Sequence, residues 1–96
     1  MFEPETRGIL QMESEAYGAS VLGTTLRYIP CRGKCRLLVV AASHGEEPDT
    51  TFLLSRSLRA FRSNFNSVVF VLCANPDGVA LGTRGNANGV DLNRNF

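Results

Sequence analysis

Residues 36–42 of the chain read RLLVVAA, and this apolar run, rich in β-branched side chains, decides the fold. A continuous apolar run of this kind predicts a strand that is covered on both faces. Residues 67–73 (SVVFVLC) predict a second strand of the same kind. Between the two runs the pattern changes to that of a helix, with Pro48 suited to its first turn. The apolar stripe of this helix, at spacings of four, three and four, consists of Leu54, Leu58, Phe61 and Phe65.

The order strand, helix, strand predicts a parallel pair joined by a right-handed crossover. Both strands then end at one edge of the sheet, so residues 44–47 (HGEE) and 75–78 (NPDG) become neighbours. Ligand sites in open α/β sheets lie at this carboxyl edge. Upstream, residues 17–30 predict a half-buried hairpin that turns at Gly23. Downstream, residues 82–96 (GTRGNANGVDLNRNF) are a long polar loop, and ordered loops of this length are usually functional.

The size and charge of the chain argue against several classes of protein. Its 96 residues suffice for one small domain, and ten Lys and Arg against nine Asp and Glu leave a net charge of +1. A nucleic-acid binder usually shows a basic face, which this balance does not favour. No apolar run approaches the roughly 20 residues that a membrane-spanning helix needs. Residues 1–10 (MFEPETRGIL) lack the apolar core of a signal peptide, so we expect a cytoplasmic location.

The first candidate for chemistry is the pair of His44, the single histidine of the chain, and Glu47. A lone histidine is more often structural than a ligand, and a glutamate three residues on arises often by chance. Its position after a buried strand favours a ligand role, because a tight turn there can point both side chains at one metal ion. A catalytic zinc site needs a third protein ligand. Neither a second histidine nor an obvious cysteine supplies one, since Cys31 and Cys35 lack a partner pair.

The terminal polar loop carries the second group of candidates. Arg84 and Arg94 suit a substrate that has a carboxylate and develops an oxyanion, since arginine binds carboxylates bidentately and stabilises developing negative charge. Asp91 could accept the second N–H of a metal-bound histidine. The alternative is that these Asp and Asn residues only build turns. That reading explains Asn88 and Gly89 but leaves the rest of the string unexplained.

Three motifs in order carry a family resemblance: residues 44–47 (HGEE), 75–78 (NPDG) and 84–96 (RGNANGVDLNRNF). Together they resemble the zinc metallocarboxypeptidases of the carboxypeptidase A type, over the chain from residue 17 onward. Residues 17–23 (YGASVLG) and 82–89 (GTRGNANG) are similar to the bacterial murein tripeptide amidase branch of that family. One such motif alone would be a weak signal, whereas three in family order are a strong one.

The resemblance implies a fold and a cofactor. The fold would be the N-terminal portion of an α/β/α sandwich with a mixed, partly parallel sheet, so that residues 1–96 form a single, incomplete catalytic domain. The cofactor would be one zinc ion, with His44 and Glu47 as its first two ligands. Asp91 would be the hydrogen-bond partner of the zinc-bound histidine.

The resemblance also implies a reaction. Arg84 matches the arginine that polarises the scissile carbonyl, and Asn93 and Arg94 match the pair that holds the substrate's terminal carboxylate. The substrate would be a small peptide with a free carboxylate, with no nucleic-acid or membrane partner. In the amidase branch the bond cleaved joins γ-D-glutamate to meso-diaminopimelate in cell-wall peptides, during murein recycling in the cytoplasm.

Two elements of the family pattern do not occur in these 96 residues. Family members carry a third zinc ligand, a histidine, and a general-base glutamate further along the chain. We therefore expect residues 1–96 alone to be inactive. Two alternatives stay open: a zinc deacylase of the aspartoacylase type, which shares parts of the same motifs, and a fragment that binds carboxylates without turnover.

Overall fold

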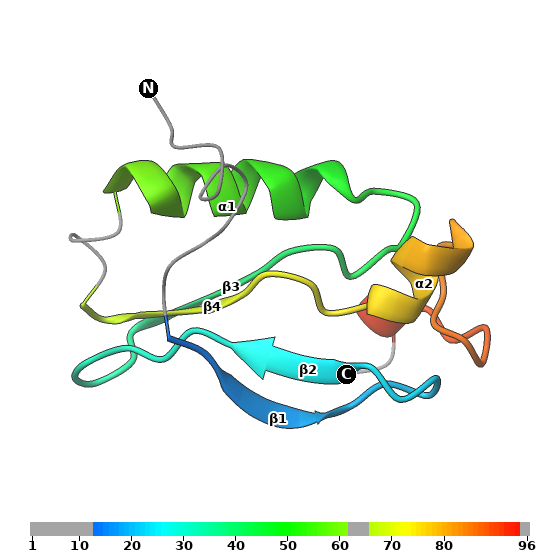
Figure 1. The fold of residues 1–96 in the computed structure, drawn as a ribbon, viewed down its shortest axis with the longest axis horizontal. Helices are drawn as coiled ribbons and strands as arrows, with labels where there is room; N and C mark the ends of the chain where they lie inside the picture. The colour runs from blue at the N-terminus through cyan, green and yellow to red at the C-terminus, as the bar shows by residue number, and fades with distance from the viewer. Residues whose placement is uncertain (1–12, 62–65, 95–96) are drawn as a thin grey trace.

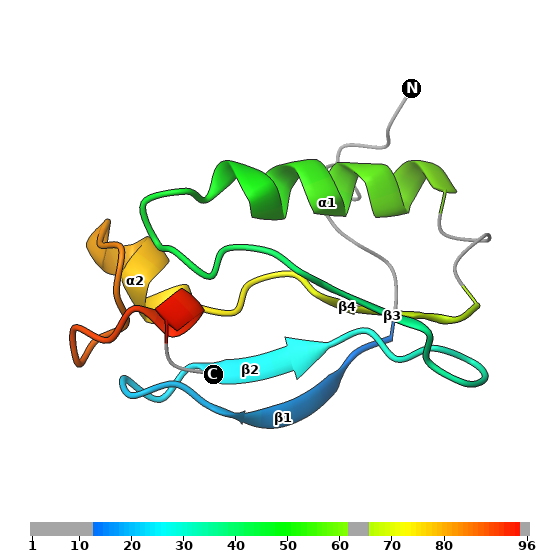
Figure 2. The same ribbon diagram turned by 180° about the vertical axis from the view of Figure 1, so that it is seen from behind.

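A computed structural model describes residues 13–61 and 66–94, with the side chain of Phe61 left out. The molecule is layered, with a long helix over one face of a parallel strand pair and an antiparallel hairpin beside that pair (Figure 1). A short helix and a 3-10 turn lie together at one end of the strands, in front and rear views alike (Figure 2). The predicted mixed α/β fold, with parallel and antiparallel pairs, is confirmed.

The parallel pair consists of β3 (Leu37–Val40) and β4 (Val68–Val71), in register from Leu37 opposite Val68 to Val40 opposite Val71. The connecting helix α1 (Asp49–Phe61) begins after Pro48, with Asp49 in its first turn and Arg59 in its last. These charges complement the helix dipole. The predicted parallel pair with a helix between its strands is confirmed. Each strand is shorter than its apolar run because the run's ends continue into loops.

The core lies between α1 and the strands. Leu58 of α1 has no exposed surface and packs with Ile29 and Phe70. Leu54, which precedes Leu58 in the predicted helical stripe, packs against the same cluster. The remaining two members, the Phe61 side chain and Phe65, lie outside the described residues.

The predicted hairpin consists of β1 (Glu15–Ala19) and β2 (Thr25–Tyr28), paired antiparallel. Its turn contains Gly23 at φ 91°, a left-handed conformation that glycine adopts without a steric penalty. The chain after β2 joins the parallel pair through an antiparallel bridge between Ile29 and Phe70. Alternate burial holds for β2, but β1 is exposed along its length, so the prediction of a half-buried hairpin is correct only for β2.

The prediction that both apolar strands are covered on both faces is wrong for β3. Side chains alternate along a strand, and Val39 packs on the α1 side. Leu38 and Val40 alternate with it and remain 58% and 45% exposed. Leu37, on the same face as Val39, is also exposed, whereas Phe70 and Val71 at successive positions of β4 are both buried. Within residues 13–61 and 66–94, the uncovered strand is therefore β3, not β4.

The NPDG stretch starts a helix that the sequence reading did not predict. Helix α2 (Pro76–Leu81) has Pro76 at its start, and Asn75 caps it by accepting a hydrogen bond from the Gly78 N–H. It ends at Gly82, which has φ 69°. The following polar loop closes with the 3-10 turn η3 (Leu92–Arg94). No helix in the described part of the chain has the length and apolar character needed to cross a bilayer.

Candidate active site

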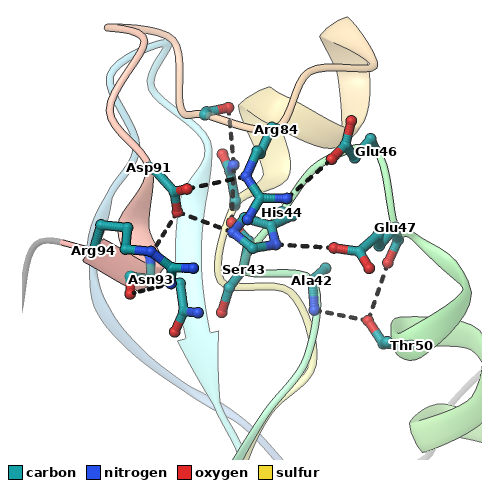
Figure 3. Close-up of polar contacts among 12 residues, drawn as sticks. Ala42, Ser43, His44, Glu46, Glu47, Thr50, Arg84, Asp91, Asn93 and Arg94 are labelled. Carbon is teal, nitrogen blue, oxygen red and sulfur yellow. Dashed lines mark hydrogen bonds and ion pairs between the residues drawn. The ribbon is translucent and has the colours of Figure 1, made fainter.

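The candidate residues converge at the carboxyl ends of β3 and β4, as the parallel topology predicts. The chain leaves β3 through Ala42, which is buried and has φ 54°. A non-glycine residue in this left-handed region carries local strain, and such strain tends to occur at functional sites. The Ala42 N–H donates to the Thr50 hydroxyl, which ties the turn to the start of α1 (2.9 Å; Figure 3). This turn directs His44 toward the polar loop that follows α2.

Gly45 allows the His44 turn to lie against α2. A Cβ atom at this position would stand 1.9 Å from the carbonyl carbon of Gly78 and 2.4 Å from the carbonyl oxygen of Thr83. Both neighbours are backbone atoms, so no side-chain rotation could relieve the contact. The glycine between the histidine and the glutamates is therefore required by backbone packing at this point.

Both ring nitrogens of His44 face carboxylates. Nδ1 lies 2.9 Å from Oε2 of Glu47, and Nε2 lies 2.9 Å from Oδ1 of Asp91 (Figure 3). The His44 side chain is largely buried, whereas Glu47 is open to solvent. The sequence reading proposed both partners, and the structure brings all three side chains together.

The two carboxylates change the ionisation of the site. Hydrogen bonds with Asp91 and then Glu47 raise the pKa of His44 above its ordinary value. The hydrogen bond from His44, supported by the Asn93 N–H and by Arg84, lowers the pKa of Asp91 to about 2. Asp91 is therefore a carboxylate at neutral pH and remains an acceptor for the Nε2–H of His44.

Arg84 belongs to the same network. Its Nε donates to Oδ2 of Asp91 at 3.0 Å, and its Nη1 donates to Oε1 of Glu46 at 3.3 Å. Asp91 thus contacts His44 through one oxygen and Arg84 through the other (Figure 3). Sequence reasoning missed the Asp91–Arg84 contact and the role of Glu46. Glu46 is the first glutamate of the HGEE motif, and its carboxylate next to the predicted ligand Glu47 was the signal that could have drawn attention to it.

Asn93 and Arg94 lie in η3, beside this network. The Asn93 N–H donates to Oδ1 of Asp91 (3.0 Å), and Asn93 also lines a cavity of about 240 Å³ together with His44 and Glu47. The Arg94 guanidinium donates to the carbonyl oxygen of Asn93 (3.1 Å) and is exposed. The structure therefore places Asn93 at the cavity and Arg94 beside it.

The donor set fits the first half of a zinc site. His44 Nδ1 and Oε2 of Glu47 lie 2.9 Å apart, so these two side chains would hold a metal ion together. The Nε2–H donated to Asp91 fixes the ring in the tautomer that leaves Nδ1 free for a metal. No group of three or more potential metal-ligating side chains occurs among residues 13–61 and 66–94. A complete site therefore needs a ligand from beyond these residues.

Comparisons with known proteins relate the chain to one described family and to a curated amidase. Residues 25–96 match the family described as "Protein of unknown function (DUF2817)". Murein peptide amidase A of Escherichia coli (strain K12) is 45% identical over 92 residues, which cover 94% of this chain and 38% of that protein. The chain thus spans about two fifths of the length of this curated relative.

Solved structures agree with the sequence relatives. The crystal structure of murein-tripeptide amidase from Escherichia coli O157 matches with a TM-score of 0.75 and 39% identity, over 99% of this chain and 42% of that one. A metallo-carboxypeptidase from Burkholderia cenocepacia matches with a TM-score of 0.70 over 97% of this chain and 32% of that one. At 22% identity this second likeness shows a shared fold.

Proposed function

The chain belongs to the DUF2817 family and is the N-terminal part of a carboxypeptidase-like fold, and from this premise we propose that its protein is a zinc-dependent peptide hydrolase. The substrate we propose is a short cell-wall peptide, and the bond hydrolysed joins γ-D-glutamate to meso-diaminopimelate. The named relatives with higher identity are murein peptide amidases, which supports this reaction class. In this proposal residues 1–96 are one part of a larger catalytic domain.

The observation that carries the proposal is the arrangement around His44. One ring nitrogen faces the Glu47 carboxylate, and the other faces Asp91. A purely structural histidine needs partners for its two nitrogens, but it does not need an exposed glutamate at the wall of a cavity. We assign His44 and Glu47 as zinc ligands and Asp91 as the residue that orients His44.

When bound, zinc would act as a Lewis acid on the scissile carbonyl and lower the pKa of a coordinated water to about 7. Arg84 is assigned to the negative charge that develops on the carbonyl oxygen. Asp91 and Glu46 hold its guanidinium at two nitrogens, so its position is set before the substrate arrives. A cation fixed in advance stabilises a transition state without reorganisation during the reaction.

Asn93 and Arg94 are assigned to the free carboxylate of the substrate. Asn93 lines the cavity beside His44 and Glu47, which brings an amide to the place where a bound peptide would end. Arg94 is exposed, and its guanidinium retains donors for a carboxylate after its bond to the Asn93 carbonyl. A bidentate arginine–carboxylate pair would orient the terminal residue.

The test uses the full-length protein and three substrates: L-Ala-γ-D-Glu-diaminopimelate, the same peptide amidated at the terminal carboxyl, and an N-acyl aspartate. We expect release of diaminopimelate from the first, loss of this activity with a chelator, and its return with Zn²⁺. The amidated peptide should be poor for the wild type. Arg94→Ala should discriminate less strongly than the wild type between the free and the amidated peptide.

The matched control is Arg56→Ala, an exposed arginine of α1 outside the set of residues assigned to the site. It should discriminate like the wild type. Equal discrimination by Arg94→Ala and the wild type would remove the carboxylate role from Arg94. Hydrolysis of the N-acyl aspartate alone would replace the peptidase proposal with a deacylase.

A further inference from the structure

Asn75 occupies the point where the loops of the candidate site meet. Only 2% of its surface is exposed. Its amide nitrogen donates to the carbonyl oxygen of Ser43 at 3.2 Å and to that of Gly85 at 3.0 Å. Ser43 directly precedes His44, and Gly85 directly follows Arg84. One buried amide therefore joins two loops: the backbone next to the proposed metal ligand His44 and the backbone next to the proposed oxyanion residue Arg84.

The cap of α2 explains only half of this side chain. Capping uses the Asn75 oxygen, which accepts from the Gly78 N–H at 2.9 Å. Serine, threonine or aspartate would serve equally well as an acceptor at a helix start. The amide N–H groups are not needed for the cap, and both are directed at loop carbonyls. The chemistry specific to asparagine is thus used to hold the two loops.

The Asn75 amide lies at a point where α2 and the Arg84 loop pack closely against each other. A Cβ on Gly78 would stand 2.4 Å from the Asn75 amide nitrogen and 2.7 Å from the Gly85 carbonyl oxygen. A Cβ on Gly85 would stand 2.9 Å from the carbonyl carbon of Gly89. The backbones of α2 and the Arg84 loop are therefore in direct contact around the amide.

Resting on the proposed function, we propose that Asn75 is a positioning residue that sets the distance between the His44 turn and the Arg84 loop. It touches neither substrate nor metal and acts through the two backbones that it joins. The separation of His44 and Arg84 determines where the substrate carbonyl can lie between them. A shift of about 1 Å in such a distance can lower a rate by about 100-fold.

Asp77, two residues on, provides a matched control. It is also buried, at 3% exposed. Its carboxylate accepts from the Ser20 hydroxyl (2.8 Å) and the Leu22 N–H (3.0 Å), both in the turn between β1 and β2. Asp77 thus ties α2 to the hairpin, as Asn75 ties it to the site. Asp77→Asn should loosen the hairpin turn and leave kcat unchanged.

The experiment compares Asn75→Asp, Asn75→Ser and Asp77→Asn in the full-length, zinc-loaded protein. Both Asn75 variants keep an acceptor for the helix cap and lose the two donors. We expect each to lower kcat about 10- to 100-fold, with KM within about threefold. In an Arg84→Ala background the loss caused by Asn75→Ser should fall below about threefold, because the position of Arg84 no longer matters.

Amide hydrogen exchange supplies a readout that does not depend on activity. Both Asn75 variants should speed exchange in residues 43–47 and in residues 83–90, whereas Asp77→Asn should speed it in residues 20–23. Faster exchange in only one of the two site loops, or unchanged kcat with both loops loosened, would overturn the positioning role. A wild-type protein without hydrolase activity would refute the proposed function, and the exchange result would still decide whether Asn75 joins the loops.

Discussion

The core beneath α1 and the candidate site at the carboxyl ends of β3 and β4 are held together in different ways. The core consists of apolar contacts around Ile29, Leu58 and Phe70, and it covers one face of a two-stranded pair. The site consists of hydrogen bonds between loops, centred on Asp91 and Asn75, and of backbone contacts that only glycine permits. Stability and site geometry should therefore respond to different substitutions.

Leu58→Ala should have the largest effect on folding. The side chain is fully buried, so the change removes apolar contacts and leaves a cavity. Substitutions of this kind cost about 2–5 kcal/mol of unfolding free energy. Urea unfolding of the full-length protein measures the loss, while kcat of the folded fraction should stay within about twofold. A large fall in kcat per folded molecule would show that core and site are not independent.

Arg84→Ala should show the reverse pattern. The guanidinium is exposed and contacts only the site carboxylates of Asp91 and Glu46 among the described residues, so the unfolding free energy should change little. We expect kcat to fall roughly 10²–10³-fold, as for the loss of other oxyanion donors. Steady-state kinetics, with urea unfolding in parallel, checks both parts. A change confined to KM would assign Arg84 to ground-state binding instead.

Asp91→Asn should reduce metal affinity or activity by about 10- to 100-fold. The substitution keeps the size of the side chain but removes the charge that holds the Nε2–H of His44 and the Nε–H of Arg84. Zinc affinity, measured by competition with a chromophoric chelator, is the direct readout. Glu46→Gln is a useful companion because it disturbs Arg84 alone. An Asp91→Asn protein with wild-type zinc affinity and kcat would contradict the role given to Asp91.

Leu53→Ala should have the smallest effect. It is the same substitution as Leu58→Ala on the same helix, but the Leu53 side chain is 68% exposed. The unfolding free energy should change by no more than about 0.5 kcal/mol. A loss comparable to that of Leu58→Ala would show that this face of α1 is covered by residues beyond those described here.

The sequence was sufficient where periodicity and topology decide the outcome. Two apolar runs around a helical stripe predicted the parallel pair of β3 and β4, and parallel strands must bring His44 near residues 75–78. Residues 75–78 were read only as a motif at the sheet edge, although Asn-Pro is a recognisable helix start. The short helix α2 was missed for that reason.

Contacts between loops could not be predicted in the same way. The Asn75 bonds to the Ser43 and Gly85 carbonyls depend on the path of three loops, and no periodic pattern encodes that path. The same holds for the Arg84–Glu46 pair, which joins residues 38 positions apart. Exposure of β3 was also misjudged, because an apolar run shows that a strand can be covered, not that the described chain covers it.

Zinc binding by the full-length wild type, His44→Ala and Glu47→Gln tests the central claim most directly. After removal of metal and dialysis against buffered Zn²⁺, the wild type should retain one zinc ion per chain, and both variants should lose it. Cys31→Ser and Cys35→Ser change the two thiols of the loop between β2 and β3. Both variants should retain zinc like the wild type. Full zinc occupancy in His44→Ala would contradict the assignment of this histidine as a ligand and, with it, the proposed site.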